Sequence, residues 1–258
     1  MLLAIDVGNT ETVLGTFHGD ELASHWRSST REDRTADELA LMLNGFLAEE
    51  GLSFREDVTG VAIASVVPAL TQSLREMVVR YLSFAPVVVE PGTRTGISIL
   101  YDNPKDVGAD RIANAAAAHA RFGGPAVVVD FGTATTFDVV SANAEYMGGV
   151  IFPGIKVSAD ALFAAAARLP RVEIVPPRGV VAKTTVESVQ AGLVYGTAGM
   201  VDGVIERIAK EVGPPVVIAT GGLAPLVVDH CSSVQHHEPW LTLEGLRLIH
   251  ERNAGRDE

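Results

Sequence analysis

Two stretches of this chain place an aspartate, a glycine and hydroxyl side chains in the same order. The first runs from Asp6 to Thr10 and follows an apolar run near the N-terminus. The second runs from Asp130 to Thr133 and follows three consecutive valines. Each pattern predicts a strand, a tight turn and a second strand, so the turn offers backbone N–H groups and Thr hydroxyls beside a carboxylate. Such a turn can receive phosphate oxygens, and its Asp can hold a cation against them.

The spacing of the two stretches indicates an internal repeat. Asp6 and Asp130 are separated by close to half of the 258 residues. Repetition on the scale of a domain predicts two similar halves. We expect each half to aim its Asp-Gly turn at a shared cleft and so hold a nucleotide from both sides. For either turn taken alone, a structural turn with no ligand is the alternative.

Composition excludes several classes of partner. The formal net charge of −12 opposes non-specific binding to nucleic acid, which needs a basic surface. Cys231 is the single cysteine, so no disulfide forms within the chain and a reducing compartment is indicated. The N-terminus lacks the basic region of a signal peptide, and no apolar run approaches the roughly 20 residues of a membrane helix. We expect a cytoplasmic protein with no nucleic-acid or membrane partner.

Strand and helix patterns alternate along the chain, which predicts an α/β fold. A Thr35–Glu38 capping box opens the first predicted helix. Because each half begins with an antiparallel hairpin, we expect mixed sheets, in two lobes at residues 1–118 and 119–258 with a central cleft. The expected strands are 2–7, 12–18, 60–68, 86–89, 126–140 (a hairpin) and 216–220, and the expected helices are 35–47, 70–82, 109–119, 157–168, 186–211 and 242–252.

The two turns belong to a larger pattern that includes Thr220-Gly221-Gly222 late in the chain. Together they resemble the duplicated, ribonuclease H-like ATPase fold shared by actin, sugar kinases and acetate kinase. In that superfamily the first two turns flank the phosphates, and the Gly-Gly lies against the adenosine. Glycine suits that place because a side chain would keep the backbone from approaching the nucleoside.

A closer resemblance comes from the middle of the chain. The segment from Tyr101 to Arg111, YDNPKDVGADR, is similar to the substrate segment of the type III pantothenate kinases. One departure is Ala182, where the family usually has Gly. The resemblance implies ATP-dependent phosphorylation of pantothenate to 4′-phosphopantothenate, the first step toward coenzyme A. Further segments agree in order along nearly the whole chain: 130–136, 148–154, 185–192 and 241–246.

Asp110 is the candidate general base. It stands at the start of a predicted helix, where the helix dipole favours an ionised carboxylate. The resemblance implies that Asp110 takes the proton from the primary hydroxyl of pantothenate as that oxygen attacks the γ-phosphorus of ATP. The structural alternative is that Asp110 only caps the helix.

The resemblance also implies the other substrate contacts. Arg111 would pair with the pantothenate carboxylate, because a guanidinium binds such groups in a bidentate manner; a surface ion pair is the alternative. Gly108 and Ala109 would give backbone contacts and room. Tyr101 would line the pocket, or else pack in the core, and Thr185 would bind substrate through its hydroxyl, or else cap a helix.

ATP and cations are assigned in the same way. Asp6 would position Mg²⁺ through water or orient the phosphates, while Asp130 would hold a monovalent cation, K⁺ or NH₄⁺. Mg²⁺ suits such a site because it keeps several waters and takes few protein ligands. The residues expected to contact ATP are Asp6, Val7, Gly8, Asn9, Thr10 and Thr133.

The resemblance further implies a homodimer, with substrate residues drawn from one subunit or both. Two other functions stay open at this point. One is phosphorylation of a different small molecule on the same fold, and the other is a non-catalytic nucleotide-binding transcriptional regulator related to this family. A P-loop kinase is excluded because the Gly-x-x-x-x-Gly-Lys-Ser/Thr pattern does not occur.

Overall fold

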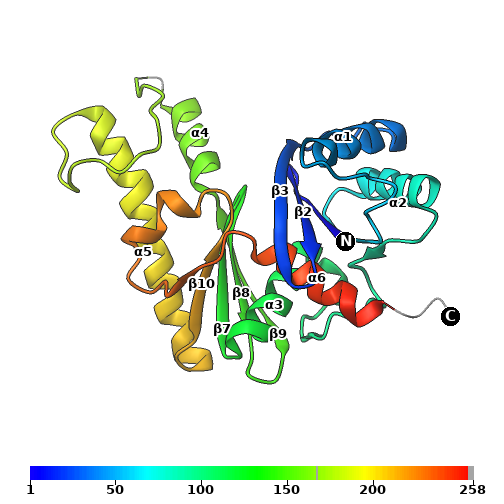
Figure 1. The fold of residues 1–258 in the computed structure, drawn as a ribbon. Helices are drawn as coiled ribbons and strands as arrows, with labels where there is room; N and C mark the ends of the chain where they lie inside the picture. The colour runs from blue at the N-terminus through cyan, green and yellow to red at the C-terminus, as the bar shows by residue number, and fades with distance from the viewer. Residues whose placement is uncertain (167, 255–258) are drawn as a thin grey trace. The chain divides into compact units, whose positions relative to one another are not determined.

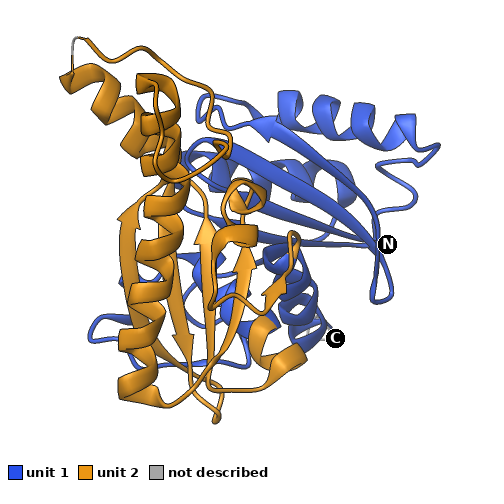
Figure 2. Cartoon of the chain, turned by 90° about the vertical axis from the view of Figure 1, so that its left-hand side faces the viewer, with its two compact units in different colours: residues 1–117, 241–258 blue, residues 118–240 orange. Residues whose placement is uncertain are grey.

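The computed structural model describes residues 1–166 and 168–254, and its contacts divide the chain into two compact units. Unit 1 contains residues 1–117 and the segment from Leu241 onward, and unit 2 contains residues 118–240 (Figure 2). The helices α3 (Ala109–Phe122) and α6 (Leu241–Asn253) are the elements at the two boundaries.

The sheet of unit 1 has the order β3-β2-β1-β4-β5, and its strands β2 and β3 are labelled in Figure 1. Its first three strands are antiparallel neighbours, and β4 then pairs with β1 in parallel. Helix α1 begins with the expected capping box, in which Thr35 and Glu38 satisfy each other's backbone N–H. The elements are β1 (Leu2–Val7), β2 (Glu11–His18), β3 (Glu21–Ser29), α1 (Ala36–Glu49), β4 (Gly60–Ser65), α2 (Pro68–Leu82), β5 (Val87–Val88), β6 (Ser98–Ile99) and the 3₁₀ turn η1 (Pro104–Asp106).

The two faces of this sheet differ in side-chain size. Large residues such as Leu3, Ile5 and Ile63 form one core cluster with α1 and α2. The other face carries small residues, and α6 packs there. A Cβ built on Gly15 would stand 2.7 Å from Leu243 of α6, and one built on Gly60 would stand 2.5 Å from His250. Small residues on this face therefore let α6 approach the sheet closely.

Unit 2 repeats the strand plan with the order β11-β10-β7-β8-β9. Strand β7 is antiparallel to β8 and parallel to β10. Alternate residues of β7, among them Val127 and Val129, join a core cluster with Val201 and Ile205 of the long helix α5. The elements are β7 (Ala126–Phe131), β8 (Ala134–Val140), β9 (Glu145–Pro153), α4 (Ile155–Ala165), α5 (Thr185–Val212), β10 (Val216–Thr220), η2 (Ala224–Leu226), η3 (Val228–His230) and β11 (His236–His237).

The internal repeat holds at the level of topology. In both units an antiparallel three-stranded meander is extended by two parallel strands on the side of its first strand. Asp6 is opposite Val13 and Ala64 in the ladders of β1, and Asp130 is opposite Thr136 and Thr220 in those of β7. Each aspartate is the last but one residue of its strand. Strands β4 and β10 occupy equivalent places, since each pairs in parallel with the strand that carries the aspartate.

Some expected boundaries differ from the structure. Strand β4 ends at Ser65, and Pro68 begins α2, because proline is well suited to the first turn of a helix. Helix α4 covers Ile155–Ala165, and residue 167 of the expected helix 157–168 lies outside the described residues. The C-terminal helix groups with unit 1, whereas the predicted lobe 119–258 groups it with the second half. A unit defined by its internal contacts need not have the same boundaries as one half of an internal repeat. The assignment of lobes to residues 1–118 and 119–258 therefore stays a prediction.

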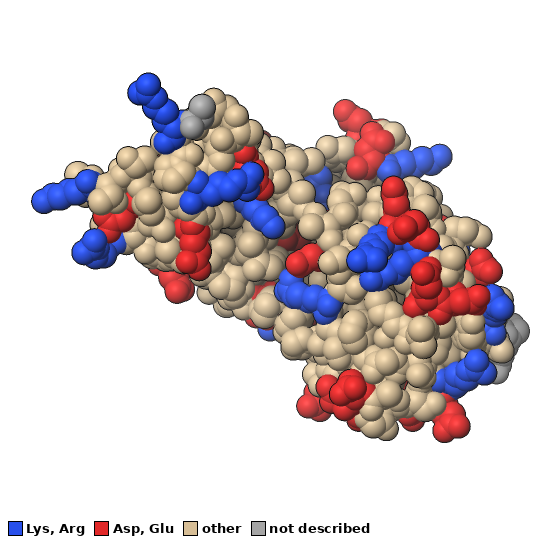
Figure 3. Space-filling view, turned by 90° about the horizontal axis from the view of Figure 1, so that it is seen from above, with Lys and Arg blue, Asp and Glu red and all other residues tan. Residues whose placement is uncertain are grey.

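Two surface properties bear on partners. Within the described residues, no helix is long and apolar enough to cross a membrane. On the face shown in Figure 3, Lys and Arg side chains are interspersed with Asp and Glu. Exposed ion pairs occur among the described residues, such as Arg27 with Glu11 at 3.1 Å and Arg80 with Asp37 at 2.8 Å.

Candidate active site

The first predicted turn lies between β1 and β2 in unit 1. Gly8 N–H donates to Glu11 O at 3.0 Å and closes the turn, and a Cβ on Gly8 would stand 3.1 Å from the same oxygen. Asp6 is half-buried, whereas Asn9 and Thr10 are exposed. The turn therefore leaves the side chains of Asn9 and Thr10 at the surface while its backbone is fixed by the hairpin.

Thr30 supports this turn, and the sequence reasoning did not assign it a role. Its Oγ1 donates to Gly8 O at 2.7 Å, and its backbone N–H donates to Thr10 O at 3.0 Å. Thr12 Oγ1 lies 2.9 Å from Thr30 Oγ1. Thr30 comes directly after β3, and the pairing of β2 with β3 brings it beside the turn. In the sequence, only the register of that hairpin could have indicated that Thr30 supports the turn.

The second predicted turn lies between β7 and β8 in unit 2. Gly132 N–H donates to Ala134 O at 3.0 Å, and Thr133 is exposed at the tip. Gly154 N–H donates to Thr133 O at 3.1 Å, so the end of β9 supports the turn from behind. Asp130 is half-buried, as Asp6 is. The two turns thus have equivalent positions in their sheets and similar exposure.

The late Gly-Gly motif belongs to the same region of unit 2. Gly221 has φ +93°, and a Cβ there would overlap Asp130 Oδ1 and stand 2.7 Å from Phe131 N. Leu223 N–H also donates to Phe131 O at 3.0 Å. The segment after β10 therefore packs directly against Asp130, which the sequence reasoning did not predict.

The start of α3 brings together the central substrate candidates in unit 1. The helix begins at Ala109, so Asp110 lies in its first turn and is not the N-cap. The backbone N–H of Arg111 donates to Asp110 Oδ1 at 2.9 Å. A Cβ on Gly108 would overlap that same Oδ1, so the carboxylate lies folded against the glycine. The position of the Asp110 carboxylate thus depends on its two neighbours in sequence.

The electrostatics of Asp110 suit a proton acceptor. Burial raises the pKa of its carboxyl above the ordinary value, while the N–H and the charge of Arg111 act in the opposite direction and lower it. A raised pKa makes the carboxylate a stronger base than an exposed aspartate.

Val66 connects the start of α3 with the first turn within unit 1. Its N–H donates to Val7 O at 3.0 Å, directly beside Asp6. Its Cγ1 lies 3.7 Å from the position of a Cβ on Gly108. The segment that carries Asp110 therefore packs beside the end of the strand that carries Asp6.

The remaining candidates have definite environments. Arg111 is 8% exposed, which excludes the alternative of a surface ion pair. Tyr101 is 36% exposed, which argues against packing in the core. Thr185 is the exposed first residue of α5, and Thr184 is the N-cap that accepts from Glu187 N–H. The alternative role of Thr185 as the cap is therefore wrong, and its hydroxyl is not used in capping.

The cysteine Cys231 and the residue types that bind metal ions are also candidates for chemistry outside these turns. Burial raises the pKa of the Cys231 thiol to about 12, with a further contribution from the charge of Asp202, so this cysteine is a poor nucleophile. Among the described residues, no group of three or more His, Cys, Asp or Glu side chains converges to hold a metal ion.

Comparison with known proteins identifies the family. The model of the type III pantothenate kinase family matches residues 2–207. The chain belongs to the type III pantothenate kinases. It is 57% identical to a type III pantothenate kinase of Acidothermus cellulolyticus over 98% of this chain and 99% of that protein. It is also 55% identical to one of Streptomyces avermitilis, over 99% of this chain and 100% of the relative.

Solved structures show the fold. An activator of 2-hydroxyisocaproyl-CoA dehydratase from Clostridium difficile with bound ADPNP superposes with a TM-score of 0.60 at 14% identity, covering 98% of this chain and 95% of that one. A ROK hexokinase from Thermus thermophilus gives a TM-score of 0.55 at 14% identity, covering 98% of both chains. The predicted fold class, a duplicated ribonuclease H-like α/β fold of the actin-like ATPases, is confirmed.

Proposed function

We propose that Asp110 is the general base of this kinase. In the reaction, the primary hydroxyl of pantothenate gives its proton to the Asp110 carboxylate while its oxygen attacks the γ-phosphorus of ATP and the bond to the β-phosphate oxygen breaks. The overall activity, ATP-dependent phosphorylation of pantothenate in coenzyme A synthesis, is that of the family and confirms the function predicted from the sequence. The half-buried carboxylate at the start of α3, beside the strand of Asp6, is the observation that supports this role most directly.

The turn from Asp6 to Thr10 is proposed to bind ATP in unit 1. At the end of β1, beside Val7 and Gly8, the turn carries the carboxylate of Asp6, the amide of Asn9 and the hydroxyl of Thr10, and Thr30 holds its backbone in place. Such donors complement phosphate oxygens. Thr133, exposed at the tip of the equivalent turn, is proposed to donate to an ATP phosphate in unit 2.

The carboxylates of these turns are proposed to act on cations. The Asp6 carboxylate would position Mg²⁺ through water or orient the phosphates, since Mg²⁺ beside ATP is usually held by few protein carboxylates, substrate phosphates and waters. Bound Mg²⁺ neutralises charge on the transferring phosphoryl group. Asp130 offers a half-buried carboxylate oxygen, a hard ligand of the kind that K⁺ or NH₄⁺ requires, and we assign the monovalent cation to it.

Pantothenate is proposed to contact the first turn of α3. The Arg111 guanidinium matches the pantothenate carboxylate in charge and geometry, and its burial makes an ion pair there stronger than at the surface. Gly108 and Ala109 leave room for the substrate, and the exposed Tyr101 and Thr185 offer hydroxyl groups. The homodimer and the cytoplasmic location stay predictions.

The direct test is a coupled assay that follows ADP production by the purified chain with Mg²⁺ and K⁺. We expect turnover with pantothenate, none with glucose or acetate, and a strong decrease when K⁺ is replaced by Na⁺. Phosphorylation of a sugar but not of pantothenate would indicate a different kinase. Binding of ATP without turnover of any acceptor would favour the regulator.

A further inference from the structure

A cavity of about 580 Å³ opens in unit 1 between a loop and the end of α6. It is lined by residues 93–98 and by Arg252. None of these residues belongs to the site proposed for ATP and pantothenate. The volume is within the range of about 300–1,000 Å³ typical of small-molecule sites. Thr, Ser and Arg make up most of the lining residues, so the chemistry of their donors decides what it binds.

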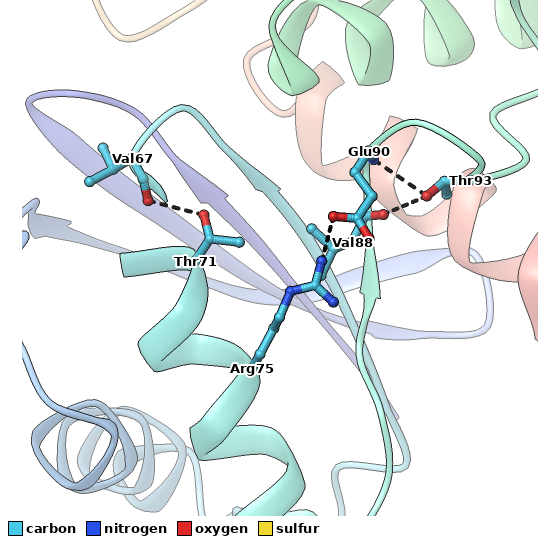
Figure 4. Close-up of polar contacts among 6 residues, drawn as sticks. All are labelled: Val67, Thr71, Arg75, Val88, Glu90 and Thr93. Atoms are coloured by element: carbon cyan, nitrogen blue, oxygen red, sulfur yellow. Dashed lines mark hydrogen bonds and ion pairs between the residues drawn. The ribbon is translucent and has the colours of Figure 1, made fainter. Parts of the chain in front are cut away.

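The first half of the loop is fixed by a polar network (Figure 4). Thr93 Oγ1 donates to Val88 O at 2.6 Å and accepts from Glu90 N–H at 3.3 Å, which closes the turn after β5. The Glu90 carboxylate in turn pairs with Arg75 of α2 at 2.6 Å. The turn that leads into the cavity is therefore anchored to a helix of the core.

The second half of the loop is fixed by α6 and by its own side chains. Asn253 accepts from Arg94 N–H at 3.2 Å and donates to Arg94 O at 3.0 Å. Thr95 Oγ1 accepts from Ile97 N–H at 3.2 Å and donates to Ile97 O at 3.1 Å. The backbone around the cavity is thus preorganised.

Donors without partners gather on this fixed loop. Within the described part of the chain, the guanidinium groups of Arg94 and Arg252 pair with no carboxylate, and the backbone N–H groups of Thr95 and Gly96 have no acceptor. Gly96 has φ +78°, and a Cβ there would stand 2.5 Å from Arg252 Cζ, so the guanidinium lies against the loop. Successive free N–H groups near a left-handed residue are typical of anion-binding loops.

Among the described residues, two acids beside this loop are already paired. Glu90 pairs with Arg75, and Glu251, next to Arg252, pairs with Arg247 at 2.6 Å. The cavity therefore carries a local positive charge in a chain whose net charge is −12. This charge pattern favours a ligand that is an anion.

We propose that this cavity binds the phosphate group of a small phosphorylated molecule. One guanidinium satisfies both oxygens of a carboxylate, whereas two guanidinium groups and two N–H groups together match the several oxygens and double charge of a phosphate monoester. The cavity is larger than a phosphate ion, so the remainder of the molecule occupies the space beside Thr93 and Ser98. This site is separate from the chemistry proposed for Asp110.

The test is a titration of the ¹⁵N-labelled full-length chain, followed by the amide signals of Thr95 and Gly96. With inorganic phosphate or glycerol 3-phosphate at constant ionic strength, both signals should shift and saturate, while acetate should produce little shift. Arg94→Gln and Arg252→Gln should each weaken the phosphate affinity by about tenfold or more, since each removes a charged hydrogen-bond donor. Reading two named amides separates this site from any phosphate bound elsewhere.

Arg80→Gln is the matched control, because it removes an arginine of unit 1 that is exposed and already paired with Asp37. It should leave the titration unchanged, and unchanged signals away from the substitution show that each variant is folded. The proposal is overturned if the two amides do not respond to phosphate, or if both arginine variants respond as the unsubstituted chain does. Equal responses to acetate and phosphate would overturn the assignment to a phosphate group.

Discussion

Gly221 lies directly against the carboxylate of Asp130. A side chain at Gly221 would overlap Asp130 Oδ1 and also stand within 2.8 Å of the backbone of Phe131. Thr220 is the ladder partner of Asp130, so the turn that begins at Gly221 leaves the sheet beside the proposed cation ligand. The absence of a Cβ at this position therefore allows the Asp130 carboxylate to lie where it does.

We predict that Gly221→Ala weakens the response to K⁺. The added methyl group displaces the Asp130 carboxylate, and changes in the groups that orient a metal ligand cost about tenfold or more in metal affinity. The concentration of K⁺ that gives half-maximal activity should rise by about that factor. The variant should also lose thermal stability, because φ +93° is unfavourable for alanine.

Gly213→Ala separates these two effects. Gly213 has φ +83° but nothing within 4 Å of a built Cβ, so alanine there introduces similar backbone strain with no contact to Asp130. Its melting temperature should fall while its K⁺ dependence stays unchanged. An unaltered K⁺ dependence in Gly221→Ala would show that Asp130 does not hold the cation or does not depend on Gly221.

Replacement of Asp110 by Asn should reduce kcat by about 10²- to 10⁴-fold, the usual contribution of a general base. ATP binding, measured by calorimetry, should be retained. The folded protein should be as stable as before or more stable at neutral pH. Burial raises the pKa of Asp110 in the folded state, so ionisation opposes folding above that pKa, and Asn removes this cost. Unchanged turnover would exclude Asp110 as the base.

The same shift predicts the pH dependence of the unsubstituted enzyme. Because only the ionised carboxylate accepts a proton, kcat should fall as the pH decreases through the raised pKa of Asp110. This acid limb should therefore lie above the pH expected for an ordinary aspartate. The residual activity of Asp110→Asn should lack the limb, and a limb that persists there belongs to another group.

Gly108→Ala should impair catalysis without unfolding the protein. Its backbone is outside the left-handed region, and the atom that a Cβ meets is the end of the Asp110 side chain, which can rotate away. That rotation breaks the bond from Arg111 N–H and moves the base, so kcat should fall by about tenfold or more while the melting temperature changes little.

Gly45→Ala in α1 is the control for this variant, since nothing lies within 4 Å of its built Cβ. It should retain kcat and gain slight stability from the helix propensity of alanine. A Gly108→Ala enzyme with normal kcat would show that the carboxylate does not need its present position.

Gly245→Ala should destabilise unit 1. A Cβ on Gly245 would overlap the backbone of Ala113, so α6 and α3 are in direct backbone contact there. Thr242 Oγ1 also donates to Asn114 Oδ1 at 2.8 Å across the same contact. Separating the helices should cost about 1–3 kcal/mol, measured by urea unfolding.

Gly199→Ala in α5 provides the comparison, because its built Cβ meets nothing within 4 Å. Alanine there should stabilise the helix by about 0.5–1 kcal/mol. Equal behaviour of the two variants would mean that the α3–α6 contact is not tight in solution.

The turns, the helix starts and the repeat could be predicted because they depend on local patterns. Asp6 and Asp130 follow apolar β-branched runs and precede glycine, and Thr35 precedes Glu38 by the spacing of a capping box. The contacts of Thr30 with Gly8, and of Gly221 with Asp130, could not be predicted in this way. Each joins residues whose proximity depends on the register of paired strands.

The amino-acid sequence by itself determined the family, the duplicated strand plan and the identity of the candidate base, because short-range spacing and residue type carry that information. The tertiary structure alone decided that α6 packs on the first sheet, that Asp110 is half-buried with a raised pKa, and that glycines lie against both the base and the proposed cation ligand. These properties arise from burial and from contacts between residues distant in sequence, and neither is set until the chain is folded.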